Sequence, residues 1–370
     1  MKEFEFRAAL QRIPKSYAVN TPQITADTID CSLGINPYGC PAAVKEALRS
    51  FDPSRLSAYP HDTVLHRTLI DYWQNDAPFG VDELTLCNGS IDGIYAISNI
   101  FSQSERREVL GFVPTFTDAA ECLRNFGMNF RGVPIRLDEN GIAAAEDLIA
   151  AITEQTALLY IDRPNNPTGQ TLSLEEMDQI LSAAETNGSY VFVDEAYGDF
   201  IPRRESVLCL RSRHPHLIVL RTFSKGLGLA NLRCGYLVAN REITGYLSRT
   251  LNPYILSDLD RQVCAAALSD PLHAAAHADD FAAAKEQLRR VTGRQITMLC
   301  TDDRVPICVL KLQSENDLQS LLLQQHILSV SGKEFDLLDA RYARIRIPAG
   351  EDVDRLIAAV EAADQGLRVR

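Results

Sequence analysis

Cys-x-x-Cys pairs and long apolar runs are both missing from this sequence, and each absence excludes a class of protein. The nine cysteines are scattered and odd in number, which is typical neither of a disulfide framework nor of a zinc site, so we expect reduced thiols. The amino-terminal segment MKEFEFRAAL alternates in charge where a secretory signal needs an apolar core, and nowhere do about eighteen uncharged apolar residues follow one another. We therefore expect a cytoplasmic protein with no membrane partner.

Basic residues are in the minority, and glycine and proline are not enriched. The 37 lysines and arginines stand against 49 aspartates and glutamates, and the resulting net charge of −12 repels nucleic acid. A chain of 370 residues, 46% of them hydrophobic, is long enough for two or three structural units with a sizeable buried core. His214 and His216 lie in a polar connector that contains proline, so we predict no metal site.

From about residue 84, short apolar runs alternate with amphipathic stretches. Apolar runs that are each followed by a helix or a loop predict buried, mainly parallel strands. The expected fold class is therefore α/β, a mostly parallel sheet with covering helices. The runs that carry this prediction are 84–87, 109–113, 157–161, 190–193, 217–220 and 235–238.

The composition of the sequence changes after about residue 256, where alanine-rich segments that favour helices begin. A smaller α+β domain is expected there, with strands near 307–312, 327–330 and 343–347 and a helix over 353–362. The predicted division is an N-terminal arm with part of the small domain (1–50), a large domain (51–255) and a C-terminal small domain (256–370).

Two of the predicted strands end in loops suited to binding a ligand, and ligands of open parallel sheets bind at such ends. The run 84–87 leads into a turn containing Gly89 and Ser90 that opens a helix, where free backbone N–H groups can bind an anion. The alternative is that Ser90 is an ordinary helix cap. The run 157–161 leads into a stiff loop of two prolines and two asparagines, which is either a plain turn or a holder for one amide side chain.

Charged groups follow two further strands. The run 190–193 ends at Asp194, which is costly to bury unless a cation or a proton partner meets it. The run 217–220 leads to Ser224 and Lys225, and Arg233 follows eight residues later. Together these groups predict pyridoxal 5'-phosphate as cofactor: the anion groups hold its phosphate, Asp194 pairs with its ring nitrogen and Lys225 forms a Schiff base with its aldehyde.

The motifs at these strand ends resemble those of the fold-type I, class I and II aminotransferases, and most closely those of the histidinol-phosphate aminotransferases. The resemblance runs in order over most of the chain and implies a pyridoxal-phosphate-dependent enzyme. Such an enzyme moves an amino group between an amino acid or amino phosphate and a keto acid through a Lys225 Schiff base. The motifs are INPYG (35–39), AYP (58–60), NGSID (88–92), PTF (114–116), NNPTG (165–169), DEAY (194–197), TFSKGLGLANLRCGY (222–236) and RYARIRI (341–347).

The resemblance also assigns expected roles. Lys225, Asp194 and Tyr197 are the expected catalytic residues, and a homodimer is expected because Tyr59 reaches the phosphate of the neighbouring subunit in such enzymes. The expected cofactor-binding residues are Gly89, Ser90, Ile91, Phe116, Asn166, Asp194, Tyr197, Thr222, Ser224, Lys225, Arg233 and Tyr59. The expected substrate-binding residues are Arg344, which grips a carboxylate or phosphate, together with Tyr17, Asn166 and Tyr254.

Two departures from the family pattern bear on the substrate. Arg163 stands where a small residue is usual, so it forms either an extra anion site or an external salt bridge. The segment 327–331 lacks the arginine that phosphate-substrate members usually carry. The motifs INPYG, DFIP (199–202) and LDARYARI (338–345) also resemble threonine-phosphate decarboxylases, so a decarboxylase of a (phospho)amino acid is the alternative function.

Overall fold

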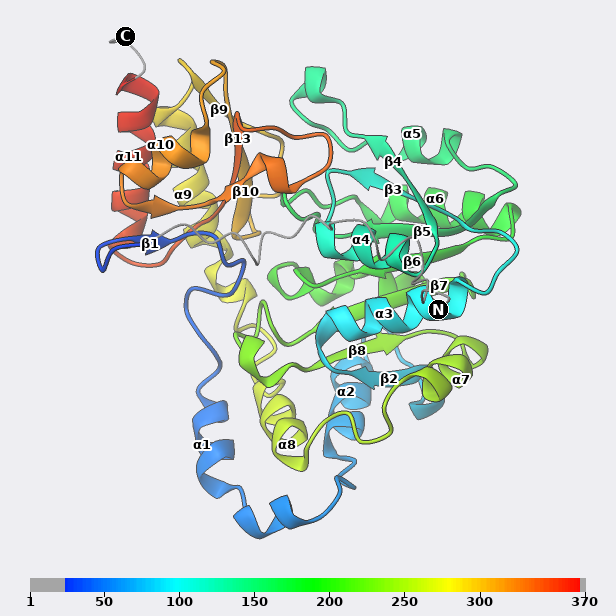
Figure 1. Cartoon of the computed structure of the whole chain (residues 1–370). Helices are drawn as coiled ribbons and strands as arrows, with labels where there is room; N and C mark the ends of the chain where they lie inside the picture. The colour runs from blue at the N-terminus through cyan, green and yellow to red at the C-terminus, as the bar shows by residue number, and fades with distance from the viewer. Residues whose placement is uncertain (1–23, 367–370) are drawn as a thin grey trace, which may run out of the picture.

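Seven strands form one sheet in the order β2-β8-β7-β6-β5-β3-β4 in the computed structural model, which describes residues 24–366 (Figure 1). β8 runs antiparallel to its neighbours β2 and β7, whereas the other adjacent pairs are parallel. The strands are β2 (Leu84–Cys87), β3 (Glu108–Val113), β4 (Asn129–Pro134), β5 (Thr156–Asp162), β6 (Tyr190–Asp194), β7 (Leu217–Thr222) and β8 (Gly235–Val238).

Helices cover both faces of this sheet because alternate strand residues point to opposite sides. One core cluster packs alternate residues of the strands against α3 (Gly89–Phe101), α4 (Thr117–Asn125) and α7 (Arg241–Thr250). The cluster on the opposite face includes residues of the helices α1 (Ala43–Ser50), α2 (Val64–Trp73), α5 (Ala145–Ala150), α6 (Leu174–Thr186) and α8 (Asp258–Ala267).

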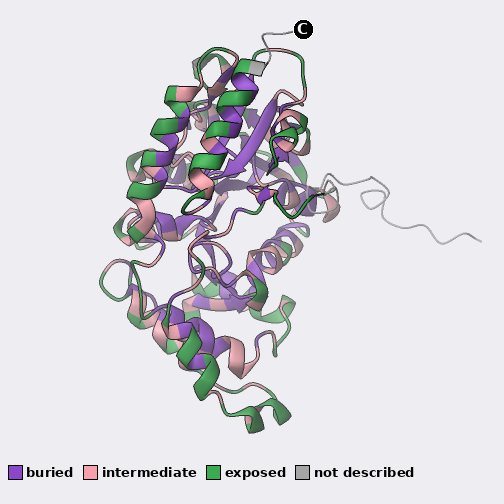
Figure 2. Ribbon diagram, turned by 90° about the vertical axis from the view of Figure 1, so that its left-hand side faces the viewer, coloured by how far each residue is buried: buried purple, intermediate pink, exposed green. Residues whose placement is uncertain are grey.

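A smaller unit lies beside the large sheet. Its antiparallel sheet has the order β12-β13-β10-β9, and a two-stranded sheet pairs β1 with β11. Buried strands in its interior and exposed outer faces of its helices are visible in Figure 2. Its elements are β1 (Ile29–Asp30), α9 (Ala278–Val291), β9 (Ile296–Met298), β10 (Ile307–Leu312), α10 (Leu318–Gln324), β11 (Ile327–Leu328), β12 (Val330–Ser331), β13 (Tyr342–Arg346) and α11 (Asp352–Gly366).

The expected fold class is confirmed, and each of the six apolar runs lies within a strand of the large sheet. β4 was not predicted, because its sequence NFRGVP at the sheet edge alternates in burial and contains no apolar run. The helix expected from Ser90 begins one residue earlier, so Asn88 occupies the cap position and Ser90 lies in the first turn.

The predicted domain division stays a prediction. β1 pairs with β11 of the smaller unit, whereas α1 and α8 pack together in the core of the large sheet. None of the helices within residues 24–366 is long and apolar enough to cross a membrane.

Candidate active site

A pocket with a volume of about 270 Å³ opens at the carboxyl ends of β5, β6 and β7. It brings together side chains that are far apart in the sequence and that arise from helix starts, strand ends and loops. Its lining residues are Ser90, Ile91, Phe116, Asp118, Asp162, Pro164, Asn166, Asp194, Ala196, Tyr197, Ser224, Lys225, Ala230 and Arg233.

One end of the pocket is suited to an anion. Gly89 at the start of α3 has φ +74°, and a Cβ at this position would lie 2.5 Å from the Arg233 guanidinium, so glycine is needed there. Arg233 also approaches Ser224 Oγ at 3.4 Å. Thr222 Oγ1 donates to Ser224 Oγ at 3.1 Å. Free helix N–H groups, hydroxyls and a guanidinium therefore meet at one place, which we call the anion cradle: Gly89, Ser90, Thr222, Ser224 and Arg233.

Asp194, the last residue of β6, lies on the floor of the pocket and is 2% exposed. Its carboxylate accepts hydrogen bonds from Tyr160 Oη at 3.1 Å and from the Ala196 N–H at 3.0 Å. Burial, together with the negative charge of Asp162, raises the pKa of Asp194 to about 7. A buried carboxylate with so high a pKa is stabilised in its charged form by a cationic N–H partner.

Lys225 follows β7, and its amine lies 5.8 Å from the centroid of the Tyr197 ring. Burial lowers the pKa of Lys225 to about 8, and the positive charge of Arg344 lowers it further than Arg233 does. Its amine is therefore more often uncharged near neutral pH than an exposed lysine would be, and only the uncharged amine is a nucleophile or a base.

Arg344 on β13, in the smaller unit, contacts Asn166, which lines the pocket. It is 2% exposed, and its Nη1 donates to Asn166 Oδ1 at 2.8 Å. Its Nη2 donates to the carbonyl oxygen of Ser32. The guanidinium thus joins the segment before Asn36, the Asn166 loop and β13.

Asp162 is a pocket residue that the sequence analysis missed. Its carboxylate accepts from Thr115 Oγ1, Phe116 N–H, Asn165 Nδ2 and Asn166 N–H, at 2.8 to 3.0 Å. The available signal was a second aspartate at a strand end, one strand away from Asp194.

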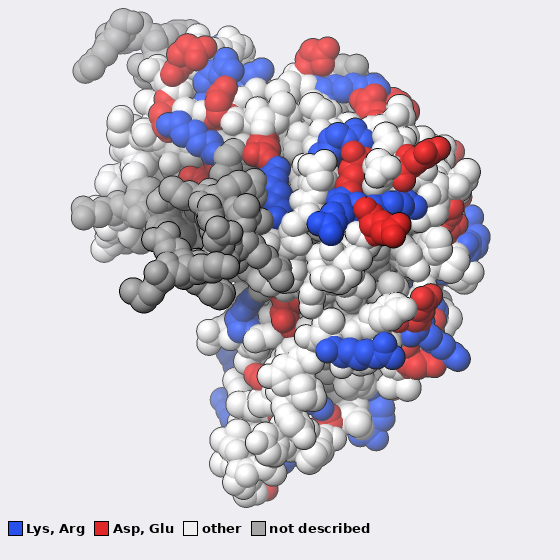
Figure 3. All heavy atoms as spheres, turned by 45° about the vertical axis from the view of Figure 1, so that its right-hand side comes forward, with Lys and Arg blue, Asp and Glu red and all other residues white. Residues whose placement is uncertain are grey.

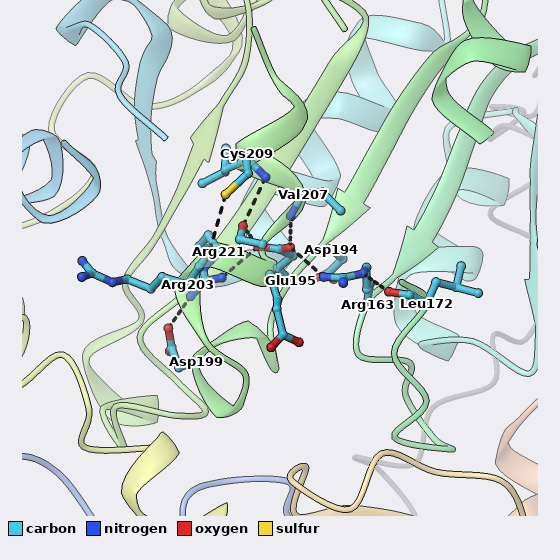
Figure 4. Close-up of polar contacts among 12 residues, drawn as sticks. Arg163, Leu172, Asp194, Glu195, Asp199, Arg203, Val207, Cys209 and Arg221 are labelled. Atoms are coloured by element: carbon cyan, nitrogen blue, oxygen red, sulfur yellow. Dashed lines mark hydrogen bonds and ion pairs between the residues drawn. The ribbon is translucent and has the colours of Figure 1, made fainter. Parts of the chain in front are cut away.

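Both expectations for Arg163 were wrong, because its side chain is buried on the opposite side of the sheet from Asp162. Arg163 Nη1 pairs with Glu195 Oε1 at 3.4 Å, and its Nε donates to the Leu172 carbonyl oxygen at 2.7 Å. Glu195 Oε2 in turn pairs with Arg221 Nη1 at 2.8 Å, and Arg221 also pairs with Asp199 (Figure 4). We call Arg163, Glu195, Arg221 and Asp199 the buried ion cluster.

Among the described residues, five expected site residues do not line the pocket: Gly89 and Thr222, which belong to the anion cradle, Arg344, which contacts Asn166, and Tyr59 and Tyr254. Tyr59 and Tyr254 stack on each other with ring centroids 4.5 Å apart, and they are 69% and 49% exposed. Tyr17 lies outside the described residues.

Comparison with known proteins gives one matching family over most of the chain. The profile of the family described as Aminotransferase class I and II matches residues 26–362. A histidinol-phosphate aminotransferase of Mannheimia succiniciproducens is 33% identical over 238 residues, which is 64% of this chain and 63% of that protein. Another from Idiomarina loihiensis is 30% identical over 282 residues, 74% of this chain and 72% of that protein. This chain therefore aligns with less than two thirds of the Mannheimia protein's length.

Solved structures share the fold at low sequence identity. A histidinol-phosphate aminotransferase of Clostridium acetobutylicum superposes with a TM-score of 0.80 at 20% identity, covering 91% of this chain and 99% of that one. An L-threonine-O-3-phosphate decarboxylase of Porphyromonas gingivalis superposes with a TM-score of 0.75 at 18% identity, covering 90% and 98%. Proteins of different activity therefore share this architecture, and the site rather than the fold has to indicate the reaction.

Proposed function

We propose, from the premise that this chain belongs to the class I and II aminotransferase family, that it transfers an amino group between an amino acid or amino phosphate and a keto acid, with pyridoxal 5'-phosphate as cofactor. The observation that carries the proposal is the meeting of Lys225, Asp194 and the anion cradle in one pocket. Each group matches a different part of that cofactor: an aldehyde, a ring nitrogen and a phosphate.

The residues present fit the cofactor. Because Gly89 has no Cβ, the Arg233 guanidinium can approach the N-terminus of α3, where an anion would meet both backbone N–H groups and this guanidinium. Phe116 and Asn166 line the same pocket, where they would contact the ring and its hydroxyl. When bound, pyridoxal phosphate supplies an electron sink for the carbanion left at the α-carbon of the substrate.

The protein's own groups would hold and move protons around that sink. Asp194 would keep a proton on the ring nitrogen, because a buried carboxylate gains most from a cationic partner. Lys225, with its pKa lowered to about 8, would carry the proton between substrate atoms. Tyr197, 3% exposed and beside Lys225, would orient the ring hydroxyl.

Arg344 would bind the carboxylate of the substrate, because a guanidinium makes a bidentate contact with a carboxylate. The described segment 327–331 contributes no arginine to the pocket, so Arg344 is the cation that we assign to the substrate. Of the two donors, an amino acid and an amino phosphate, we favour the amino acid, and the experiment below compares them.

A panel of amino acids and amino phosphates, mixed with the purified holoenzyme, tests the proposal. We expect a change in the cofactor spectrum and a product that has lost nitrogen as an amino group, with a keto acid needed to complete the cycle. A product that has lost carbon dioxide, with no need for a keto acid, would replace the proposal by the decarboxylase alternative.

We also propose a homodimer as the working unit. Leu56 (62% exposed) and Tyr59 are exposed apolar side chains in the segment after α1, and the exposed Tyr254 stacks on Tyr59. The lower end of the face in Figure 3 carries few charged side chains. Exposed apolar side chains that lie together are typical of a surface that binds another protein. The cytoplasm is the proposed location, where free thiols such as the nine found here stay reduced.

Hybrid formation tests the dimer. If Tyr59 completes the neighbouring site, mixing inactive Lys225→Ala with impaired Tyr59→Ala should restore activity, because one site of each hybrid has both wild-type side chains. A monomer in sedimentation, or no restoration on mixing, would contradict this part of the proposal.

A further inference from the structure

Asp162 lines the pocket but belongs neither to the anion cradle nor to the residues expected to be catalytic. It is the last residue of β5 and is 7% exposed. Its four donors come from two loops, the one after β3 and the one after β5. Asp162 Oδ1 accepts from Thr115 Oγ1 at 3.0 Å and Asn165 Nδ2 at 2.8 Å. Asp162 Oδ2 accepts from the backbone N–H groups of Phe116 at 3.0 Å and Asn166 at 2.9 Å.

These hydrogen bonds fix the two residues that we place against the cofactor ring. Phe116 and Asn166 both line the pocket, and a single oxygen of Asp162 holds the backbone of both. All four partners donate, so a carboxylate, which only accepts, satisfies them, whereas an asparagine would turn one donor group toward them.

Asp162 also lies directly beside Asp194. The two residues are register partners on the adjacent parallel strands β5 and β6, and their side chains point to the same face of the sheet. Burial raises the pKa of Asp162 to about 6, and hydrogen bonds from the four partners oppose that rise, so the carboxylate is mainly charged at neutral pH. A charged neighbour is the second cause, after burial, of the raised pKa of Asp194.

We propose that Asp162 is a positioning residue of the cofactor pocket, which sets the places of Phe116 and Asn166 through its hydrogen bonds and acts on Asp194 through its charge. This inference rests on the proposed function. Asp162 contacts Phe116 and Asn166, which would touch the cofactor. A purely structural role would not change how cofactor binding depends on pH, whereas the proposed role does.

The test is the dissociation constant of pyridoxal phosphate, measured by equilibrium dialysis against apo-protein between pH 5.5 and 8.5. In the wild type, affinity should fall as the pH drops through about 7, because protonation of Asp194 removes the partner of the ring nitrogen. Asp162→Asn should raise the dissociation constant about tenfold at pH 8.5, the equivalent of one lost charge-assisted hydrogen bond. The fall in affinity at low pH, which we call the acid limb, should also move to lower pH in this variant, because Asp194 has lost a negative neighbour. The difference in dissociation constant between variant and wild type should therefore be smaller at pH 6 than at pH 8.5.

Asp364→Asn is the matched control. Asp364 is also a buried carboxylate (1% exposed), and its Oδ1 accepts from the N–H groups of Gln295 and Ile296 at 2.8 and 2.7 Å, in the smaller unit. This variant should leave the pyridoxal phosphate affinity and its acid limb within twofold of the wild type. If Asp162→Asn behaves in the same way, or if its penalty is the same at every pH, the proposal is overturned.

Thr115→Val gives a second reading if Asp162→Asn does not fold. It keeps the shape of the side chain and the charge of Asp162 but removes one donor. We expect a two- to fivefold weaker affinity, on the order of a neutral hydrogen bond, and an unmoved acid limb. Unchanged affinity would overturn the proposal. A wild type that does not bind pyridoxal phosphate at all would instead overturn the proposed function, and this inference with it.

Discussion

Arg344 and Asn166 are joined by a hydrogen bond of 2.8 Å across 178 positions of the chain, from β13 of the smaller sheet to the loop after β5 of the large one. The cation assigned to the substrate therefore holds the amide assigned to the cofactor ring. Binding of a substrate carboxylate at Arg344 would therefore act directly on Asn166.

Arg344→Lys should weaken substrate binding more than cofactor binding. Lysine keeps the charge but loses the planar fork that binds a carboxylate through two hydrogen bonds. We expect KM to rise about tenfold or more, on the scale of one charge-assisted hydrogen bond, while the pyridoxal phosphate affinity changes less. Arg289→Lys, in a surface pair with Asp303, is the control and should change neither quantity. If substrate binding and cofactor binding weaken equally, Arg344 does not belong to the substrate site.

Asp194→Asn should lower kcat by about 100-fold or more, the scale on which a single preorganised electrostatic partner contributes to catalysis. The neutral amide cannot hold a proton on the ring nitrogen, although it fills the same space. Steady-state kinetics with saturating cofactor measure this effect. A variant with wild-type kcat would show that the carboxylate is not the partner of the ring.

The uptake of pyridoxal phosphate by apo-protein should depend on pH through Lys225. Its pKa is lowered from the usual 10.5 to about 8, chiefly by burial, so the rate should rise with pH up to about 8 and then level off. Arg344→Gln should move this inflection to higher pH, because Arg344 is a positive neighbour that lowers the pKa of Lys225. Stopped-flow absorbance measures the rate. An inflection near 10.5 would mean that the lysine is not held in the buried site described here.

Glu195→Gln should destabilise the apo-protein strongly. Glu195 lies between Arg163 and Arg221, so its loss leaves Arg163 without this ion pair and Arg221 with Asp199 as its remaining partner in the buried ion cluster. Breaking a buried pair in this way costs about 3–5 kcal/mol. Glu205→Gln breaks a partly exposed pair with Arg304 and should cost less than about 1 kcal/mol. Urea unfolding followed by circular dichroism compares the two. Similar losses in both variants would show that the buried ion cluster contributes little to stability.

The sequence predicted pocket residues at strand ends because an apolar run followed by charged or polar residues can be recognised without knowing the fold. Asp194 directly follows the run 190–193, and Lys225 lies in the loop that follows the run 217–220. The sequence could not place Arg163, because the outcome depended on register: Arg163 lies one position beyond Asp162, so its side chain points to the opposite face, where Glu195 of the next strand meets it. Asp162 was missed for a related reason, since its four donors converge only after β3 and β5 have paired.

Mapping the lysine that binds the cofactor tests the central claim most directly, and the chain supplies its own comparison. Lys285 is also buried with a pKa near 8, but it does not line the pocket, and its amine donates to Thr301 Oγ1 and to the Asp302 and Ile307 carbonyl oxygens. Borohydride reduction of the holoenzyme, followed by peptide mass spectrometry, should place the label on Lys225 alone, and Lys225→Ala should lose both the label and turnover. Label on Lys285, or full activity in Lys225→Ala, would contradict the account.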